Sequence, residues 1–130
     1  MPSHNFSSNV TVENINLDLI SICKIFVSGD TGPLHIASAF GVNTISLFGP
    51  SDPRLVAPVT KNVDDSENIY IWKKPECSPC YTPETAIDMS NSKYWRGNKF
   101  ICYMGEHVCM KSITVEEVFN AISKIINKFQ

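Results

Sequence analysis

Four residues in one short run have side chains and spacing suited to a phosphorylated ligand. The run is Asp30-Thr31-Gly32, with His35 about one helical turn after Thr31. The Thr31 hydroxyl can donate a hydrogen bond to a phosphate oxygen, and Gly32 lets the backbone approach an anion with no side chain in the way. His35 can face the same ligand, whereas a carboxylate such as Asp30 accepts hydrogen bonds from sugar hydroxyls better than it meets phosphate. The run therefore predicts an anion site beside a hydroxyl-binding carboxylate.

Purely structural roles also account for these residues. Asp30 or Thr31 can cap a helix, Gly32 can serve a turn, and His35 can be a half-buried histidine with satisfied hydrogen bonds. The run matches neither a Walker loop nor a G-x-G-x-x-G fingerprint. Spacing alone leaves the structural and the functional interpretations open.

The elements around the run are those that would present it to a ligand. Residues 24–28 and 43–48 have the composition of buried strands, residues 33–40 that of the helix between them, and 69–72 that of a third strand. A further helix capped by Thr11 is expected before the first strand. Alternating helices and strands predict an α/β fold with a parallel sheet and flanking helices. Such sheets bind ligands outside the carboxyl ends of their strands, where a helix N-terminus attracts anions.

Composition limits the classes of protein to consider. The 130 residues are 43% hydrophobic, which is enough for one domain with a core. A net charge of −2 argues against a nucleic-acid partner, and no apolar run approaches the ~20 residues of a membrane span. Residues 1–10 lack the basic start and apolar core of a signal peptide, which predicts a cytoplasmic protein.

Residues 73–112 differ from the rest and are expected to form a long, mostly irregular excursion. They hold four cysteines: Cys77, Cys80, Cys102 and Cys109. Four such thiols can form a structural zinc site, with His107 as a substitute ligand. Reduced, packed thiols and disulfides are the alternatives, and a cytoplasmic setting disfavours disulfides. Cys23 is expected inside the first helix as a small buried hydrophobe.

After the excursion, Thr114 is expected to cap a final helix. Its apolar residues form one stripe, which we expect to pack on the sheet: Val115, Val118, Phe119, Ile122, Ile125, Ile126 and Phe129.

The segment from Asp30 to Pro53 resembles the C-terminal signature of the bacterial heptosyltransferase-like glycosyltransferases, family 9. That signature is a D-[TS]-G-x-x-H-x-A run, a helix of small residues, a glycine, a strand and an LFGP-x-x-P turn. The residues that match it are Asp30, Thr31, Gly32, His35, Ala37, Gly41, Leu47, Phe48, Gly49, Pro50 and Pro53. The CSPCY segment at 77–81 and the run from Cys109 to Val118 resemble the family's tail, so the resemblance covers residues 11–129.

The resemblance implies a partial C-terminal domain of a GT-B fold, which has two Rossmann-like domains with the active site between them. Residues 11–130 would be this donor-binding domain, and residues 1–10 a frayed terminus. The implied donor is ADP-heptose, with Asp30 binding the sugar and Thr31, Gly32 and His35 binding the diphosphate. The implied reaction is inverting transfer to the lipopolysaccharide inner core, with no metal or cofactor required.

The chain is much shorter than a complete member of that family. The N-terminal domain, which would bind the acceptor and carry the general base, is absent from it, so we expect no catalytic residue here and no activity from this chain alone. The uncovered apolar surface is expected to promote self-association. Peripheral contact with the inner face of the cytoplasmic membrane is also compatible with such a transferase. A non-catalytic truncated module and a cysteine-stapled interaction domain are the alternative interpretations.

Overall fold

Three parallel strands form the central sheet in a computed structural model, which describes residues 17–58 and 66–129. They are β1 (Ile25–Gly29), β2 (Asn43–Phe48) and β3 (Asn68–Trp72), in the spatial order β1-β2-β3. Ile45 at the centre of β2 lies opposite Val27 on one side and Ile69 on the other. The three predicted strands and their parallel direction are confirmed.

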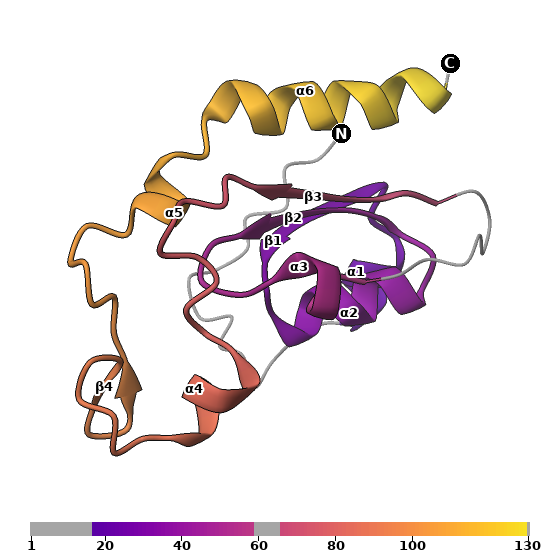
Figure 1. Cartoon of the computed structure of the whole chain (residues 1–130). Coiled ribbons are helices and arrows are strands. Elements are labelled where there is room, and N and C mark those ends of the chain that lie inside the picture. Colours follow the sequence, from indigo (N-terminus) through magenta and orange to yellow (C-terminus); the bar gives the residue numbers. More distant parts are fainter. Residues whose placement is uncertain (1–16, 59–65, 130) are drawn as a thin grey trace, which may run out of the picture.

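Helices lie on both faces of this sheet, as Figure 1 shows. α1 (Leu17–Ser21) and α2 (Gly32–Ala39) lie on one face, and α6 (Val115–Ile126) crosses the other. α2 contacts β1 and β2, while α6 contacts β2 and β3. The predicted α/β, Rossmann-like arrangement of a parallel sheet with flanking helices is therefore confirmed. None of the helices in the described ranges is long and apolar enough to cross a membrane.

The core is centred on β2, because a middle strand is covered on both faces. Its Ile45 and Phe48 have no exposed surface, and neither do Leu34 of α2 and Ile125 of α6. Thr44 is buried too, and its hydroxyl donates a hydrogen bond to Asn68 Oδ1. Central polar side chains are therefore tolerated where a neighbouring strand supplies a partner.

The excursion contains more regular structure than its sequence indicates. It includes α4 (Pro83–Ile87), a hairpin of β4 (Trp95–Arg96) with β5 (Lys99–Phe100), and α5 (Val108–Lys111). The Phe100 ring organises this part: its centroid lies 4.8 Å from that of Tyr81, 5.9 Å from that of Tyr94 and 5.3 Å from that of Trp95. In Figure 1 the region of α4 and β4 projects away from the sheet. Because it does not pack on the sheet, its own aromatic cluster provides its core.

Helix α6 begins as predicted but packs less completely than predicted. The Thr114 hydroxyl accepts from Glu117 N–H and the Glu117 carboxylate accepts from Thr114 N–H, which is a capping box. A hydrogen bond from the Lys73 ammonium lowers the pKa of Glu117. Of the apolar stripe, however, Ile125 is fully buried while Val115 is 87% and Phe119 63% exposed. The expectation that the whole stripe packs on the sheet was wrong, because the described sheet is only three strands wide.

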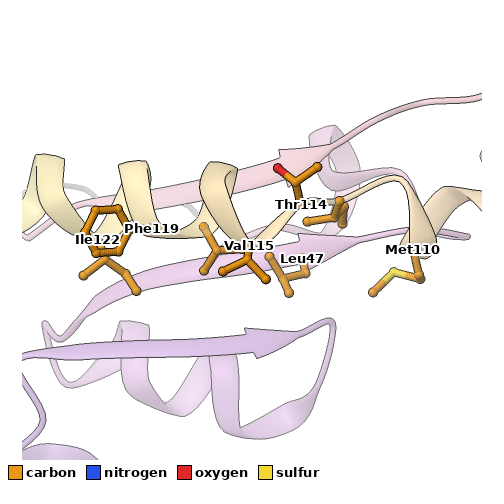
Figure 2. Close-up of a pocket in the computed structure, with 8 residues that line it drawn as sticks. Leu47, Met110, Thr114, Val115, Phe119 and Ile122 are labelled. Carbon is orange, nitrogen blue, oxygen red and sulfur yellow. The ribbon is translucent and has the colours of Figure 1, made fainter.

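A largely apolar cavity of about 390 Å³ lies where α6 is incompletely packed. Figure 2 shows Ile122 and Val115 of α6, Leu47 of β2 and Met110 of α5 along one row, with Met110 at one end. The exposed stripe and this cavity are the kind of surface that favours self-association, which remains a prediction.

Two expectations near the N-terminus have different outcomes. The Thr11 cap and the frayed residues 1–10 lie outside the described residues. Cys23 does not lie inside the first helix, because α1 ends at Ser21. Cys23 is half-buried, packs against the cluster of Ile20, Ala37 and Val42, and donates its thiol hydrogen to Leu19 O at 3.2 Å.

Candidate functional site

The predicted ligand-binding run lies at the sheet edge formed by the carboxyl ends of the strands. β1 ends at Gly29, and Asp30 and Thr31 lead directly into α2. Because all three strands are parallel, the turn after β2 (49–52) and the residues that follow β3 (73–74) lie at this same edge. This is the edge at which open parallel sheets bind ligands.

The start of α2 is oriented by two buried side chains. Leu34 and Ala37, one turn apart, have no exposed surface, while the side chain of His35 is 49% exposed. Thr31 occupies the N-cap position with an extended backbone, but within the described residues its side chain does not cap the helix. Instead the Thr31 and Ser28 hydroxyls hydrogen-bond each other at 3.0 Å. Capping therefore does not account for the threonine at this position.

The structure brings Asp30 and His35 together beside this helix start. His35 Nε2 lies 3.9 Å from Asp30 Oδ1, which is an ion-pair distance only when the imidazole is protonated and is too long for a hydrogen bond. A Cβ placed on Gly32 would meet no described atom within 4 Å. Packing inside the chain therefore does not require a glycine at position 32.

A cavity of about 430 Å³ opens beside Asp30, within the size range of small-molecule sites. Its lining comes from the end of β1, from the turn and short helix α3 (Pro53–Val56) after β2, and from the excursion. The lining residues are Asp30, Ser51, Asp52, Leu55, Val56, Pro79, Tyr81, Thr82, Pro83, Glu84 and Ala86. Of the four predicted ligand-binding residues, Asp30 is the one on this lining; Thr31, Gly32 and His35 continue from it along the sheet edge.

Asp52 on the lining is tied to Arg54. The Asp52 carboxylate accepts from Arg54 N–H at 2.9 Å and so caps α3, and it also accepts from Arg54 Nε at 2.9 Å and Nη2 at 2.7 Å. The side-chain hydrogen bond from Arg54 lowers the pKa of Asp52, and the same bond raises the pKa of Arg54. The guanidinium carbon also lies 5.2 Å from the centre of the Trp72 ring. Asp52 is thus a negatively charged residue whose carboxylate is held by Arg54 and caps α3.

The lining offers hydroxyls and carboxylates rather than a concentration of positive charge. Ser51, Tyr81 and Thr82 carry hydroxyls, and Asp30 and Glu84 carry carboxylates. Carboxylates accept hydrogen bonds and hydroxyls both donate and accept them, which suits a ligand rich in hydroxyl groups. The cavity and the adjacent helix start therefore differ in chemistry, one suited to a sugar and the other to an anion.

The excursion wall of the cavity is held by hydrogen bonds to the turn after β2. Ser78 Oγ donates to Gly49 O at 2.5 Å and accepts from Trp72 Nε1 at 3.0 Å. The N–H groups of Cys80 and Tyr81 both donate to Pro50 O at 2.9 Å. These contacts fix the residues that follow, which line the cavity.

Sequence reasoning missed most of this lining. The positions of Ser51 and Asp52 follow from the predicted parallel strands, because the turn after the second strand must lie beside the end of the first. The wall formed by Tyr81, Thr82 and Glu84 comes from a segment whose sequence indicates a group of cysteines and a resemblance to the family's tail, but no cavity lining. No short-range pattern signals that this segment returns to Pro50.

The four cysteines of the excursion lie in one region. Burial raises the pKa of the Cys80 thiol, and repulsion between its thiolate and any negative charge on Cys109, Cys102 and Cys77 raises it further. Burial also raises the pKa of Cys109, against an opposing hydrogen bond from the Met110 backbone. Residues 17–58 and 66–129 nevertheless contain no group of three or more His, Cys, Asp or Glu side chains already arranged to hold a metal ion. All five cysteines are free thiols in the structure.

Comparison with known proteins identifies the family whose sequence pattern includes this edge of the sheet. The sequence pattern of Glycosyltransferase family 9 (heptosyltransferase) matches residues 14–86, which include β1, α2, β2, β3 and the first part of the excursion. That range is more than half of the chain and contains the whole run from Asp30 to His35.

Curated relatives agree with this match. Lipooligosaccharide heptosyltransferase 2 of Campylobacter jejuni subsp. jejuni serotype O:6 is 24% identical over 106 residues, which are 82% of this chain and 27% of the relative. Lipopolysaccharide heptosyltransferase 2 of Escherichia coli K12 is 38% identical over 42 residues, 32% of this chain and 12% of the relative. Lipooligosaccharide heptosyltransferase 2 of Haemophilus influenzae is 39% identical over 49 residues, 36% of this chain and 14% of the relative.

No solved structure gives a significant match to the chain. The chain spans little more than a quarter of the Campylobacter relative, which it matches over the most residues of these three. The family match across the strand ends and the helix start nevertheless identifies the chain: it belongs to glycosyltransferase family 9, the heptosyltransferase family.

Proposed function

We propose that the chain is the donor-binding part of a heptosyltransferase that transfers a heptose, with inversion, from ADP-heptose to the lipopolysaccharide inner core. The proposal is supported by membership of glycosyltransferase family 9 and by relatives named lipooligosaccharide or lipopolysaccharide heptosyltransferase 2. It assigns the diphosphate to the start of α2 and the sugar to the cavity beside Asp30.

The observation that carries the proposal is the position of Asp30 between two chemically different surfaces. Its carboxylate lines the cavity of about 430 Å³ together with hydroxyl and carboxylate side chains. The next two residues, Thr31 and Gly32, open α2. A nucleotide sugar has the matching order, a hydroxyl-rich ring joined directly to a diphosphate.

The diphosphate assignment is supported by three features of the helix start. Pro33 has no N–H group and the Leu34 N–H donates to Thr31 O at 3.2 Å, so among the first three residues of α2 an anion would meet the N–H of Gly32. The helix dipole adds about half a positive charge there. Thr31 presents a hydroxyl that is not used as a cap in the described structure. The space beside Gly32, where a Cβ would meet no described atom within 4 Å, leaves room for a phosphate oxygen to approach the backbone.

The remaining parts of the reaction would come from outside this chain. We propose that residues 11–130 form part of a C-terminal donor domain, and that the acceptor site and the general base lie in the portion of the relatives that the chain does not span. With the base absent, the chain alone would bind donor without transferring sugar. A cytoplasmic location and contact with the inner face of the cytoplasmic membrane are part of the same proposal.

A titration of the isotopically labelled chain with ADP, followed by NMR, tests the diphosphate assignment. We expect the amide signals of residues 29–36 to shift. The Kd should be in the millimolar range, which corresponds to a binding free energy of about −4 kcal/mol. Gly32→Ala should weaken ADP binding several-fold without lowering the melting temperature, because the added methyl group meets no described atom of the chain within 4 Å and would meet the ligand.

Two comparisons complete the test. Adenosine, which lacks phosphates, should leave the signals of residues 29–36 largely unchanged. ADP-heptose should shift signals on the cavity wall, such as those of Ser51, Tyr81 and Glu84, which ADP alone leaves in place. Shifts confined to residues far from 29–36, or an unaltered ADP affinity of Gly32→Ala, would contradict the proposal.

A further inference from the structure

We propose that the tip of the excursion, residues 87–104, docks on the surface of a membrane that contains anionic phospholipids. The inference rests on the proposed function only in that it names the surface that makes the proposed membrane contact. Docking requires neither a nucleotide sugar nor the start of α2, so the two proposals can fail separately.

Large apolar side chains are exposed on the two segments that flank the β4–β5 hairpin. Ile87 at the end of α4 is 84% exposed, and Met89 just after it is 48% exposed. On the other side of the hairpin, Met104 is 56% exposed. Single exposed apolar residues are ordinary on a protein surface, whereas a group of them marks an interaction surface.

Contacts with the hairpin bring the two flanking segments together. Trp95 Nε1 of β4 donates a hydrogen bond to Thr85 O of α4 at 2.7 Å, two residues before Ile87. On the other flank, the Tyr103 ring lies edge-on to the Tyr94 ring, with 5.5 Å between the ring centroids. The exposed apolar residues therefore belong to one part of the molecule, in the region that projects away from the sheet in Figure 1.

The tip is positively charged on a chain that is negatively charged overall. Residues 87–104 contain Lys93, Arg96 and Lys99 and a single acidic residue, Asp88, whereas the whole chain has a net charge of −2. Arg96 and Lys99 lie opposite each other in the hairpin and are exposed, and within the described residues neither forms an ion pair with a carboxylate. Anionic headgroups attract such a group of basic side chains.

Aromatic rings accompany the basic side chains. The Lys93 ammonium lies 4.4 Å from the centre of the Tyr103 ring and 5.3 Å from that of the Tyr94 ring. Tyrosine, with an apolar ring and a polar hydroxyl, is enriched at the level of the lipid headgroups. Exposed apolar side chains beside basic and aromatic ones match a bilayer surface, which offers both negative charge and hydrocarbon. A nucleic acid would match the charge but would not cover the aliphatic side chains.

Helix α4 connects the tip to the cavity beside Asp30. Its Pro83, Glu84 and Ala86 line the cavity, and Ile87 at the end of the same helix is part of the tip. A tip docked on a bilayer would therefore hold the cavity close to the membrane surface. Under the proposed function, a lipopolysaccharide acceptor anchored by its lipid would be met there.

The test measures co-sedimentation of the whole chain with lipid vesicles. Vesicles of phosphatidylglycerol mixed with phosphatidylcholine should sediment the chain, whereas vesicles of phosphatidylcholine alone should not. High salt should weaken the binding, because ions screen the attraction between exposed charges. Equal sedimentation with both kinds of vesicle, or none with either, would overturn the proposal.

Charge variants show whether the tip makes the contact. Arg96→Gln combined with Lys99→Gln should weaken binding to the anionic vesicles about tenfold or more, since each basic residue near such a surface contributes to the attraction. Lys24→Gln combined with Lys124→Gln removes the same charge from exposed sites elsewhere and should bind nearly as well as the unaltered chain. Equal losses in the two double variants would show that net charge, and not the tip, sets the binding.

Apolar variants test the other half of the contact. Ile87→Ser should weaken vesicle binding several-fold, because it removes an exposed side chain that would enter the bilayer. Val115→Ser is the matched control, since Val115 is 87% exposed on α6, and it should bind normally. Undiminished binding of Ile87→Ser, with circular dichroism showing all variants folded, would contradict the proposal.

An ADP titration of the same chains separates this proposal from donor binding. The double variant of Arg96 and Lys99 should keep the ADP-induced shifts of residues 29–36. An unaltered chain that shows those shifts but ignores anionic vesicles would refute the docking and leave the donor assignment intact. A chain that binds the vesicles through the tip but does not respond to ADP would do the reverse.

Discussion

Thr31→Val is expected to weaken ADP binding by roughly tenfold or more, which from a millimolar starting affinity means that saturation is lost. The substitution keeps the size of the side chain and removes its hydroxyl. A hydrogen bond to a charged group is worth about 1.5–3 kcal/mol, and the proposal gives the Thr31 hydroxyl a phosphate oxygen as partner. The measurement is the NMR titration of residues 29–36 with ADP.

The hydrogen bond between Thr31 and Ser28 provides the control for this prediction. Ser28→Ala removes the same 3.0 Å contact but leaves the Thr31 hydroxyl in place, so it should bind ADP nearly as well as the unaltered chain. Thr31→Ser should restore most of the affinity. Equal losses in Ser28→Ala and Thr31→Val would mean that the hydroxyl acts on the turn rather than on the ligand.

Phe48→Ala is expected to lower the free energy of unfolding by about 3–5 kcal/mol, the range for removing a buried aromatic ring. Phe48 ends the central strand with no exposed surface and meets the Tyr70 ring edge-on at 6.4 Å between centroids. Typical domains have a total stability of about 5–15 kcal/mol, so this loss would leave the chain marginally folded. Urea denaturation followed by circular dichroism measures it.

Phe119→Ala is the matched control, because it deletes the same ring from α6 at a site that is 63% exposed. Its expected cost is below about 1 kcal/mol. A cost for Phe119→Ala as large as that of Phe48→Ala would show that the exposed side of α6 is covered in solution, for example by a second copy of the chain.

The sheet could be predicted because its signals are local. Short apolar segments, separated by a short helix and by turns containing Gly and Pro, specify β1, α2 and β2 almost residue by residue, although of the two strands only β2 contains buried residues. The capping box at Thr114 and Glu117 likewise marks the start of α6. The burial of α6 could not be predicted, because an apolar stripe does not reveal how wide a surface is available to cover it.

The candidate site was predicted in part for the same reason. The run from Asp30 to His35 is contiguous, and the structure keeps its members together. The far wall of the cavity depends on Ser78 and Cys80 returning to Gly49 and Pro50, a contact between segments about thirty residues apart. Such a contact has no periodicity that a sequence pattern can reveal.

The docking of the excursion on the Gly49–Pro50 turn also has a consequence for the order of folding. The start of α2 needs only β1 and β2, which are neighbours in the chain, whereas the cavity beside Asp30 needs residues about fifty positions later. Contacts between distant residues form late because a long loop must be closed first. Amide hydrogen exchange should accordingly be slower in β2 than at Cys80 and Tyr81, whose N–H groups report the docked wall. The half of the site to which we assign the diphosphate would thus persist through openings in which the half assigned to the sugar has come apart.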